Sequence, residues 1–136
     1  MSYDFQWIVP GRVIYIHAEG MATEDEVLSH DQRMEPFLAE VGTERFHVVL
    51  DVQDTTGMPP FGAFRKVQWS RDPRLGFFVI TGISNQLGRF SASVITQMIG
   101  LNYRFAATVP DALKLMNEMD TSLPNLLEAA REKAIV

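Results

Sequence analysis

Residues 47–58, HVVLDVQDTTGM, contain the segment that decides the fold. A short apolar run rich in β-branched residues ends at Asp51, and a group of Asp, Thr and Gly residues follows it. A run of this length and composition predicts a buried strand over 46–52, with a turn over 54–57. In open α/β folds, binding and regulatory residues collect beyond the carboxyl ends of strands. This turn is therefore the first place to look for function.

The composition of the whole chain restricts its class. The chain has 136 residues, no cysteine and a formal net charge of −5. This length suits a single domain over residues 1–136. The acidic balance argues against a nucleic-acid binder, and the lack of cysteine excludes disulfides, thiolate nucleophiles and Cys-ligated metals. With no apolar stretch of ~20 residues and no signal peptide at the start, we expect a cytoplasmic protein without a transmembrane segment.

The start of the chain predicts a β-hairpin. Two strand-like runs, at 7–9 and 12–17, flank the Pro-Gly pair at 10–11. Proline and glycine supply the backbone dihedral angles of a tight turn. Because glycine weakens a strand, Gly20 is expected to end the second run. The two runs should therefore pair as neighbouring antiparallel strands.

A helix is predicted after the hairpin. Residues 23–26, TEDE, form a capping box, and Gly42 is a suitable C-terminal stop. Pro36 lies inside this helix and should kink or split it, because proline lacks the N–H group that the helix requires. A second helix is expected to begin near Pro59, since proline is favoured in the first helical turn.

Five further elements follow the 47–58 segment and its helix. In order, they are a wholly apolar strand at 75–81, a helix at 84–100, a strand at 103–107, a helix capped by Thr108, and a short C-terminal helix opened by residues 122–124. Strands that alternate with helices predict crossover connections and parallel pairing. We therefore predict an α/β fold with a small, mixed, mostly parallel five-stranded sheet and four to five helices.

In element order and local pattern, the chain resembles the STAS domain, the fold of the SpoIIAA-like anti-sigma-factor antagonists. The strand ending in Asp51 is similar to the central strand of that family, and residues 108–113, TVPDAL, are similar to its last strand-to-helix junction. The resemblance covers about residues 7–120 and leaves 121–136 as a C-terminal helical extension. It implies a non-enzymatic bacterial regulatory protein that binds another protein and needs no cofactor.

The resemblance also suggests a regulatory switch. Residues 54–58, DTTGM, are similar to the family motif Asp-Ser-Ser/Thr-Gly-apolar, whose first hydroxyl is phosphorylated at the start of a helix. It implies Thr55 as the acceptor, within a candidate switch loop made of Asp51, Asp54, Thr55, Thr56 and Gly57. Helix N-termini favour phosphate groups. The prolines at 59–60 indicate a later helix start, so the alternatives are a degenerate acceptor loop or a plain turn.

Two other segments are candidate sites. Ser84 and Asn85 precede a predicted helix, where they would bind an anion or, as the alternative, act only as a cap. A local group of basic residues beside a tryptophan would meet an acidic partner protein or anionic lipid, or would be a solvated helix end. This candidate partner patch consists of Arg65, Lys66, Trp69, Arg71 and Arg74.

Three hypotheses about function follow. The first is the STAS-type regulatory or protein-interaction module. The second is a protein that binds a small apolar ligand or lipid, because Phe and Met are frequent around the predicted second and third helices. The third is a metal-dependent enzyme that uses Asp51 and Asp54.

The histidines and the C-terminal helix are also candidate sites. His17 and His47 with Asp51 could be imagined as a metal site, but no metal-ligand spacing is present, and hydrogen-bonded strand histidines are expected instead. We predict no catalytic residue and no metal. The C-terminal helix is expected to pack on its own domain or to form a homodimer.

Overall fold

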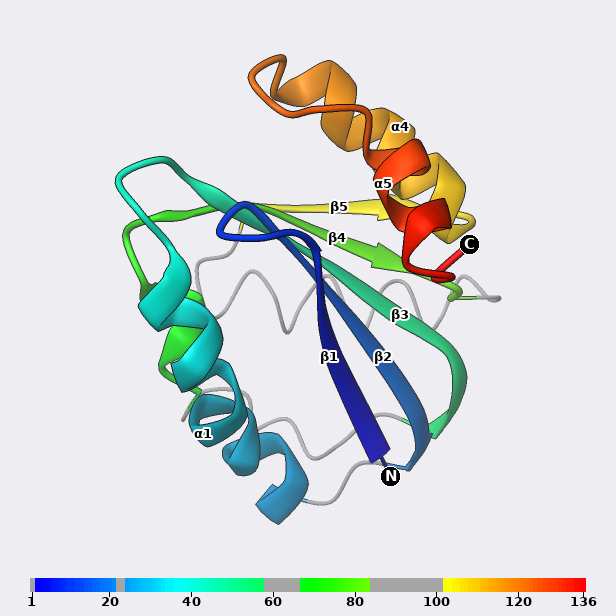
Figure 1. Cartoon of the computed structure of the whole chain (residues 1–136). Helices are drawn as coiled ribbons and strands as arrows, with labels where there is room; N and C mark the ends of the chain where they lie inside the picture. Colours follow the sequence, from blue (N-terminus) through cyan, green and yellow to red (C-terminus); the bar gives the residue numbers. More distant parts are fainter. Residues whose placement is uncertain (1, 22–23, 58–66, 84–101) are drawn as a thin grey trace.

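A five-stranded sheet with helices on both faces forms the centre of the molecule (Figure 1). The computed structural model describes residues 2–21, 24–57, 67–83 and 102–136. The strands follow one another across the sheet in chain order: β1 (Ser2–Val9), β2 (Val13–Met21), β3 (Phe46–Gly57), β4 (Leu75–Thr81) and β5 (Tyr103–Ala106). β1 pairs with β2 in antiparallel fashion, and the other neighbours are parallel. The predicted α/β class and mixed, mostly parallel sheet are confirmed.

The described residues contain three α-helices and one short 3-10 helix: α1 (Glu24–Glu40), the 3-10 helix Trp69–Arg71, α4 (Val109–Met119) and α5 (Leu126–Glu132). The predicted cap of α4 is confirmed, because Thr108 Oγ1 accepts a hydrogen bond from the Asp111 N–H at 3.2 Å. The helices predicted from Pro59 and over 84–100 lie outside the described residues. Within the described ranges, no helix is long and apolar enough to cross a membrane.

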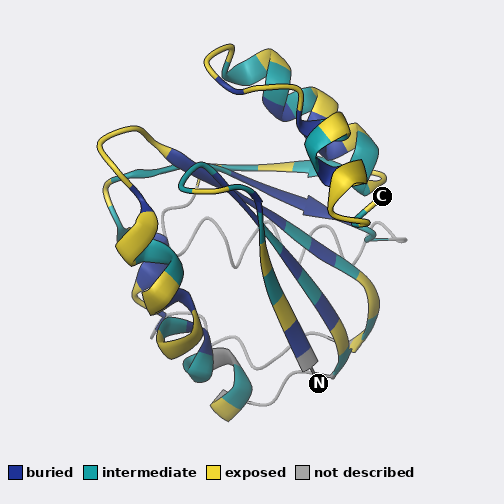
Figure 2. Ribbon diagram, in the orientation of Figure 1, coloured by how far each residue is buried: buried dark blue, intermediate teal, exposed yellow. Residues whose placement is uncertain are grey.

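Two apolar cores lie on opposite faces of the sheet. Alternate strand residues point to opposite faces, so Ile14 and Ile16 of β2 pack toward α1, whereas Val13 packs toward α4. Leu126 of α5 is fully buried in the second core, and α5 contacts α4 and β1. The C-terminal helix therefore packs on its own domain. Figure 2 shows the buried residues concentrated in the central strands between the two helical layers.

Two strands run further than the sequence predicts. β3 continues to Gly57, and β2 continues past Gly20 to Met21, with Gly20 aligned to Thr55 and Met21 to Gly57. Gly20 has a φ of 77° and lies where the strand register shifts, so it forms an irregularity within β2 instead of ending it. The predicted turn at 54–57 and the predicted strand end at Gly20 are therefore wrong. Pairing between the two strands outweighs the local turn preference of Asp, Thr and Gly.

Two helix predictions also need correction. Of the two outcomes predicted for Pro36, a kink or a split, the split does not occur, because α1 remains one helix through this residue. Pro36 is exposed, and solvent can therefore satisfy the carbonyl group that it leaves without an N–H partner. α5 begins later than predicted, at Leu126, because the Asn125 side chain caps it by accepting the Glu128 N–H at 3.0 Å.

A buried histidine connects the start of β3 to the end of α4. His47 is 1% exposed; its Nδ1 accepts the Phe77 N–H at 2.9 Å, so the neutral ring carries its proton on Nε2 and donates to Asp120 at 2.8 Å. Asp120 also accepts hydrogen bonds from Arg12 at 3.0 Å and from Ser122 at 2.6 Å. We call Arg12, His47, Asp120 and Ser122 the closed network. It joins the turn between β1 and β2, the start of β3 and, through the Phe77 N–H, β4 to the segment that follows α4.

Burial and hydrogen bonding set the charges of the closed network. Burial lowers the pKa of His47, against the opposing effect of its bond to Asp120, so the ring stays neutral. For Asp120, burial acts to raise the pKa, but hydrogen bonds from Ser122 and His47 outweigh it and lower the pKa to about 2. The network therefore contains an ionised carboxylate beside a neutral imidazole.

A second buried histidine lies on the other face of the sheet. His30 of α1 is 7% exposed and packs edge-on against Tyr3 and Phe5, with ring centroids 3.9 and 5.4 Å away. Its Nε2 has no hydrogen-bond partner among the residues that the structure describes. Burial, with a smaller effect from Arg33, lowers the pKa of His30 to about 4. His30 is therefore neutral at pH 7.

Candidate functional site

Polar side chains form a row across the carboxyl end of the parallel strands. The sheet register aligns Asp4 of β1 with His17 of β2, His17 with Asp51 of β3, and Asp51 with Thr81 of β4. Aligned residues on neighbouring strands project from the same face, here the face that α4 and α5 partly cover. We call these four residues, together with their neighbours Tyr15 and Asp54, the polar cluster.

Two hydrogen-bonded pairs hold the polar cluster together. The Tyr15 hydroxyl donates to Asp51 at 2.9 Å, and His17 Nε2 lies 2.8 Å from an Asp54 oxygen. Asp51 is buried and also accepts the Gln53 N–H at 3.1 Å. Burial raises the pKa of Tyr15, and the hydrogen bond to Asp51 raises it further. The phenol is therefore a permanent donor to Asp51 at physiological pH.

The candidate switch residues divide into buried and exposed groups. Asp51 is buried, and the Thr55 hydroxyl donates to the Val52 carbonyl at 2.7 Å. Asp54 and Thr56 are exposed near the end of β3, as Figure 2 shows for this part of the strand. The aligned pairs of β3 with β4 end at Asp51–Thr81, whereas those with β2 continue to Gly57. Thr56 is thus the more accessible of the two hydroxyls.

The chain makes a close crossing directly after β4. Gly82 has a φ of 84°, and a Cβ built on it would lie 2.6 Å from the backbone nitrogen of Gln53. Only glycine fits both the dihedral angle and the contact. This crossing fixes the exit of β4 against β3 beside the polar cluster. Ser84 and Asn85, the candidate anion site, lie outside the described residues.

The candidate partner patch is not one continuous positive surface in the part that the structure describes. Trp69 is 7% exposed and packs against Phe78, with ring centroids 5.8 Å apart. Arg74 donates to Asp72 at 2.8 Å and to the Val41 carbonyl at 3.1 Å. Arg65 and Lys66 lie outside the described residues. Arg71 is exposed, and its role in binding a partner stays a prediction.

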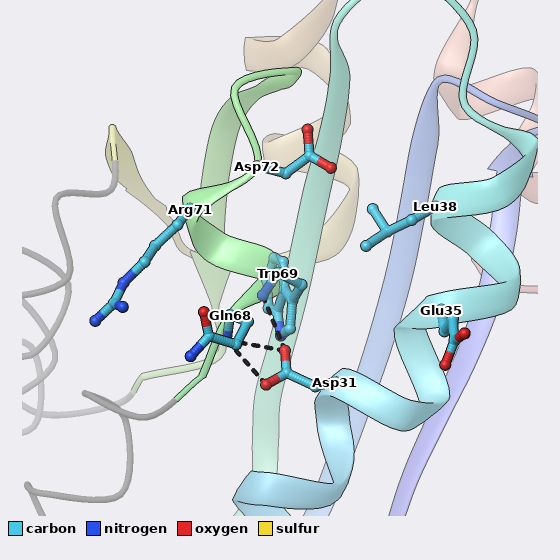
Figure 3. A pocket seen from close by; sticks show the side chains of 7 residues that line it. All are labelled: Asp31, Glu35, Leu38, Gln68, Trp69, Arg71 and Asp72. Atoms are coloured by element: carbon cyan, nitrogen blue, oxygen red, sulfur yellow. Dashed lines mark hydrogen bonds between the residues drawn. The ribbon is translucent and has the colours of Figure 1, made fainter.

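Trp69 and Arg71 border a hollow of about 500 Å³ between α1 and the 3-10 helix (Figure 3). Asp31 of α1 accepts hydrogen bonds from the N–H groups of Gln68 and Trp69 at 2.8–2.9 Å. Its carboxylate therefore holds the 3-10 helix against α1. Glu35 and Asp72 add further acidic groups to the lining, so this hollow has mixed charge.

The structure separates the two strand histidines. His17 bonds Asp54 at the carboxyl end of the sheet, whereas His47 bonds Asp120 at the other end of β3. The expectation of hydrogen-bonded strand histidines is confirmed. Within the described ranges, no group of three or more His, Asp or Glu side chains could hold a metal ion.

The sequence pointed to Asp51 and Asp54, and to His17 only as part of a metal site with His47, but not to Tyr15, Asp4 or Thr81. Tyr15 and His17 alternate along one strand, and this spacing was the available signal, because alternate residues share a face. Asp4 and Thr81 join the cluster only through the register of β1 and β4, which the sequence alone does not define.

Comparisons with known proteins agree with this architecture. No family model matches the sequence, and no curated protein matches it as a relative. Among solved structures, an uncharacterised protein of the DUF3478 family from Shewanella loihica PV-4, described as having a SpoIIAA-like fold, superposes with a TM-score of 0.63. The two share 16% identity, over 84% of this chain and 91% of the other. This chain has a SpoIIAA-like fold.

A second solved structure supports the same conclusion. The anti-sigma factor antagonist SpoIIAA, in its unphosphorylated form, superposes with a TM-score of 0.56 at 11% identity. The match covers 85% of this chain and 98% of SpoIIAA. At these identities, the likeness establishes the SpoIIAA-like, or STAS, fold and leaves function to be argued from the site.

Proposed function

We propose that this chain is a non-enzymatic regulatory module of STAS type, which binds a partner protein through the carboxyl end of its sheet. The observation that carries the proposal is the end of β3, where exposed Asp54 and Thr56 lie beyond the last aligned pair with β4. Two contacts at Gln53 hold this segment in place: its N–H donates to Asp51, and its backbone lies against Gly82. A rigid strand end with exposed polar groups suits protein recognition.

The arrangement of hydroxyls and histidines supports a non-enzymatic role. A nucleophilic hydroxyl needs a base within hydrogen-bond reach. In the described part of the chain, His17 and His47 bond carboxylates, and the Ser122 hydroxyl donates to Asp120 and not to the histidine. Among the described residues, no serine or threonine hydroxyl is hydrogen-bonded to either imidazole, so neither pair activates a nucleophile.

We propose Thr56 as the position at which phosphorylation would regulate the module. SpoIIAA, which has the same fold, is described in an unphosphorylated form. The Thr55 hydroxyl is bonded to Val52, whereas Thr56 is exposed. A phosphate on Thr56 would add negative charge close to Asp54. It would therefore weaken the binding of a partner protein that contacts this end of the sheet.

Site-specific photo-cross-linking tests the proposed function. A benzophenone amino acid at Thr56 should give a discrete protein adduct in cells of the source organism, while the same group at exposed Lys114 of α4 should not. The absence of an adduct at Thr56, or equal adducts at both positions, would contradict the proposal. For the identified partner, Thr56→Glu should weaken binding about tenfold, and Thr56→Val should leave it unchanged.

The apolar-ligand hypothesis and the homodimer remain predictions. Two hollows that border described elements are each lined by charged and apolar groups together, so neither of these favours a purely apolar ligand. Light scattering of the purified protein would test the homodimer directly.

A further inference from the structure

A groove crosses the open part of the sheet next to the polar cluster. It has a volume of about 450 Å³ and is bordered by Asp4, Gln6, Tyr15, His17, Ala134 and Ile135. β1 and β2 supply its floor, and the segment after α5 supplies one wall. The helices α4 and α5 leave this end of the sheet uncovered (Figure 1).

The groove carries negative charge that the described residues do not neutralise with a strong cation. Asp4 is exposed, and the Asp54 side chain is 58% exposed. Within the described ranges, neither these two carboxylates nor Asp51 form an ion pair with a lysine or arginine. The same three carboxylates act together on the Tyr15 hydroxyl and help to raise its pKa. Asp4 lines the groove itself, whereas Asp51 and Asp54 lie directly behind its lining residues Tyr15 and His17, to which they are hydrogen-bonded.

Aromatic surface also borders the groove. The rings of Tyr15 and His17 are stacked, 6.5 Å apart at 28°, and present aromatic surface next to the carboxylates.

We propose that this groove binds an arginine side chain of the partner protein. A guanidinium group stacks on aromatic rings and forms paired hydrogen bonds with carboxylates, which are the two surfaces present. The inference rests on the proposed function and names the chemistry of the partner: a basic segment that places an arginine over the face of β1 and β2, against the segment after α5. The chain's net charge of −5 also favours encounter with such a segment.

Nuclear magnetic resonance with a defined peptide tests this inference. The probes are the capped peptide Gly-Gly-Arg-Gly-Gly and its citrulline counterpart, which has the same shape without the charge. The arginine peptide should shift the amide signals of Asp4, Tyr15 and His17, and the citrulline peptide should not. No shift at these signals, or equal shifts with both peptides, would overturn the inference.

Matched variants separate the groove from general charge. Asp4→Asn/Asp54→Asn should weaken binding of the arginine peptide about fivefold. Glu35→Gln/Glu118→Gln removes two charges from exposed positions of α1 and α4 and should leave binding unchanged. An equal loss in both would show that only the net charge matters. If the double variant does not fold, Asp4→Asn alone provides the test, because Asp4 is exposed and makes no ion pair among the described residues.

The peptide experiment and the cross-linking experiment can give opposite results, so they test the arginine site and the proposed function separately. If the cross-link at Thr56 forms but the arginine peptide does not bind, the interaction role stands and the arginine site is wrong. If neither is observed, the proposed interaction at this end of the sheet is wrong as well.

Discussion

The two ends of the sheet contain similar residues in opposite arrangements. Each has a histidine bonded to an aspartate at 2.8 Å. At the closed network, the His47 and Asp120 side chains are 1% and 20% exposed, and other protein groups bond both. At the polar cluster, the His17 and Asp54 side chains are 23% and 58% exposed, beside a groove. The same pair therefore stabilises the fold where it is enclosed and is available for recognition where it is open.

The largest expected effect comes from disturbing the closed network through its neighbour in β4. Gly76→Ala should lower the free energy of unfolding by about 3 kcal/mol, because the added methyl group would overlap the buried His47 ring. The ring cannot move aside without breaking its two hydrogen bonds. Urea denaturation followed by circular dichroism measures this loss.

Gly42→Ala is the matched control for this prediction. No atom lies within 4 Å of a Cβ built on Gly42. This variant should therefore change stability by no more than about 0.5 kcal/mol. Equal stability of the two variants would show that His47 is not held rigidly.

A second prediction compares the two aspartates directly. Asp120→Ala should cost about 2 kcal/mol, because the buried His47 and the partly buried Arg12 lose the acceptor of their hydrogen bonds. Asp54→Ala should cost about 0.5 kcal/mol or less, since its bond to His17 is open to water. Urea midpoints at pH 7 measure both values. Equal costs would remove the distinction between the enclosed and open ends.

A third prediction uses pH to compare the two buried histidines. The folded-state pKa of His30, about 4, lies below the unfolded value of 6.5, so the unfolded chain binds the proton first. The stability present above pH 6.5 is therefore lost as the pH falls toward 4. For His30 alone, the expected loss between pH 7 and pH 5 is about 2 kcal/mol.

His47 should contribute in the same direction, because its pKa is also lowered, but its bond to Asp120 opposes the shift. His30→Phe should remove the His30 part of the loss and keep the His47 part. Urea midpoints at pH 7 and pH 5, for the wild type and the variant, measure the difference. An identical pH dependence in both proteins would show that His30 does not titrate as its burial implies.

A fourth prediction, with a smaller loss than those at the buried histidines, concerns the polar cluster itself. Tyr15→Phe should cost about 1 kcal/mol, because Asp51 loses one of its hydrogen bonds. A double-mutant cycle with Asp51→Asn should give a coupling energy of about 1 kcal/mol, and a cycle with Asp54→Asn should give almost none. Coupling to Asp54 as large as that to Asp51 would mean that the cluster acts as one unit.

Much of the fold follows from local sequence. The apolar run at 75–81, the Pro-Gly turn at 10–11 and the cap at Thr108 each have a local physical cause, and the structure contains all three. The extension of β3 could not be predicted in this way. Residues 54–57 favour a turn when taken alone, and only pairing with β2 makes them a strand.

The candidate site was predictable only in part, for a related reason. Asp51 and Asp54 stood out because they follow an apolar strand. Their partners Tyr15 and His17 precede them by more than thirty residues, and Asp120 lies 73 residues from His47. Such contacts depend on strand register and on where the last helices pack, which no local pattern encodes.

The position of α4 and α5 has a consequence for biosynthesis. These helices cover one face of the sheet, and all five described strands leave the ribosome before them. Until they emerge, Val49 and Val79 on that face have no helical cover, and His47 lacks Asp120. The nascent sheet therefore exposes an apolar face that is prone to aggregation, and this face is closed only when both helices have been made.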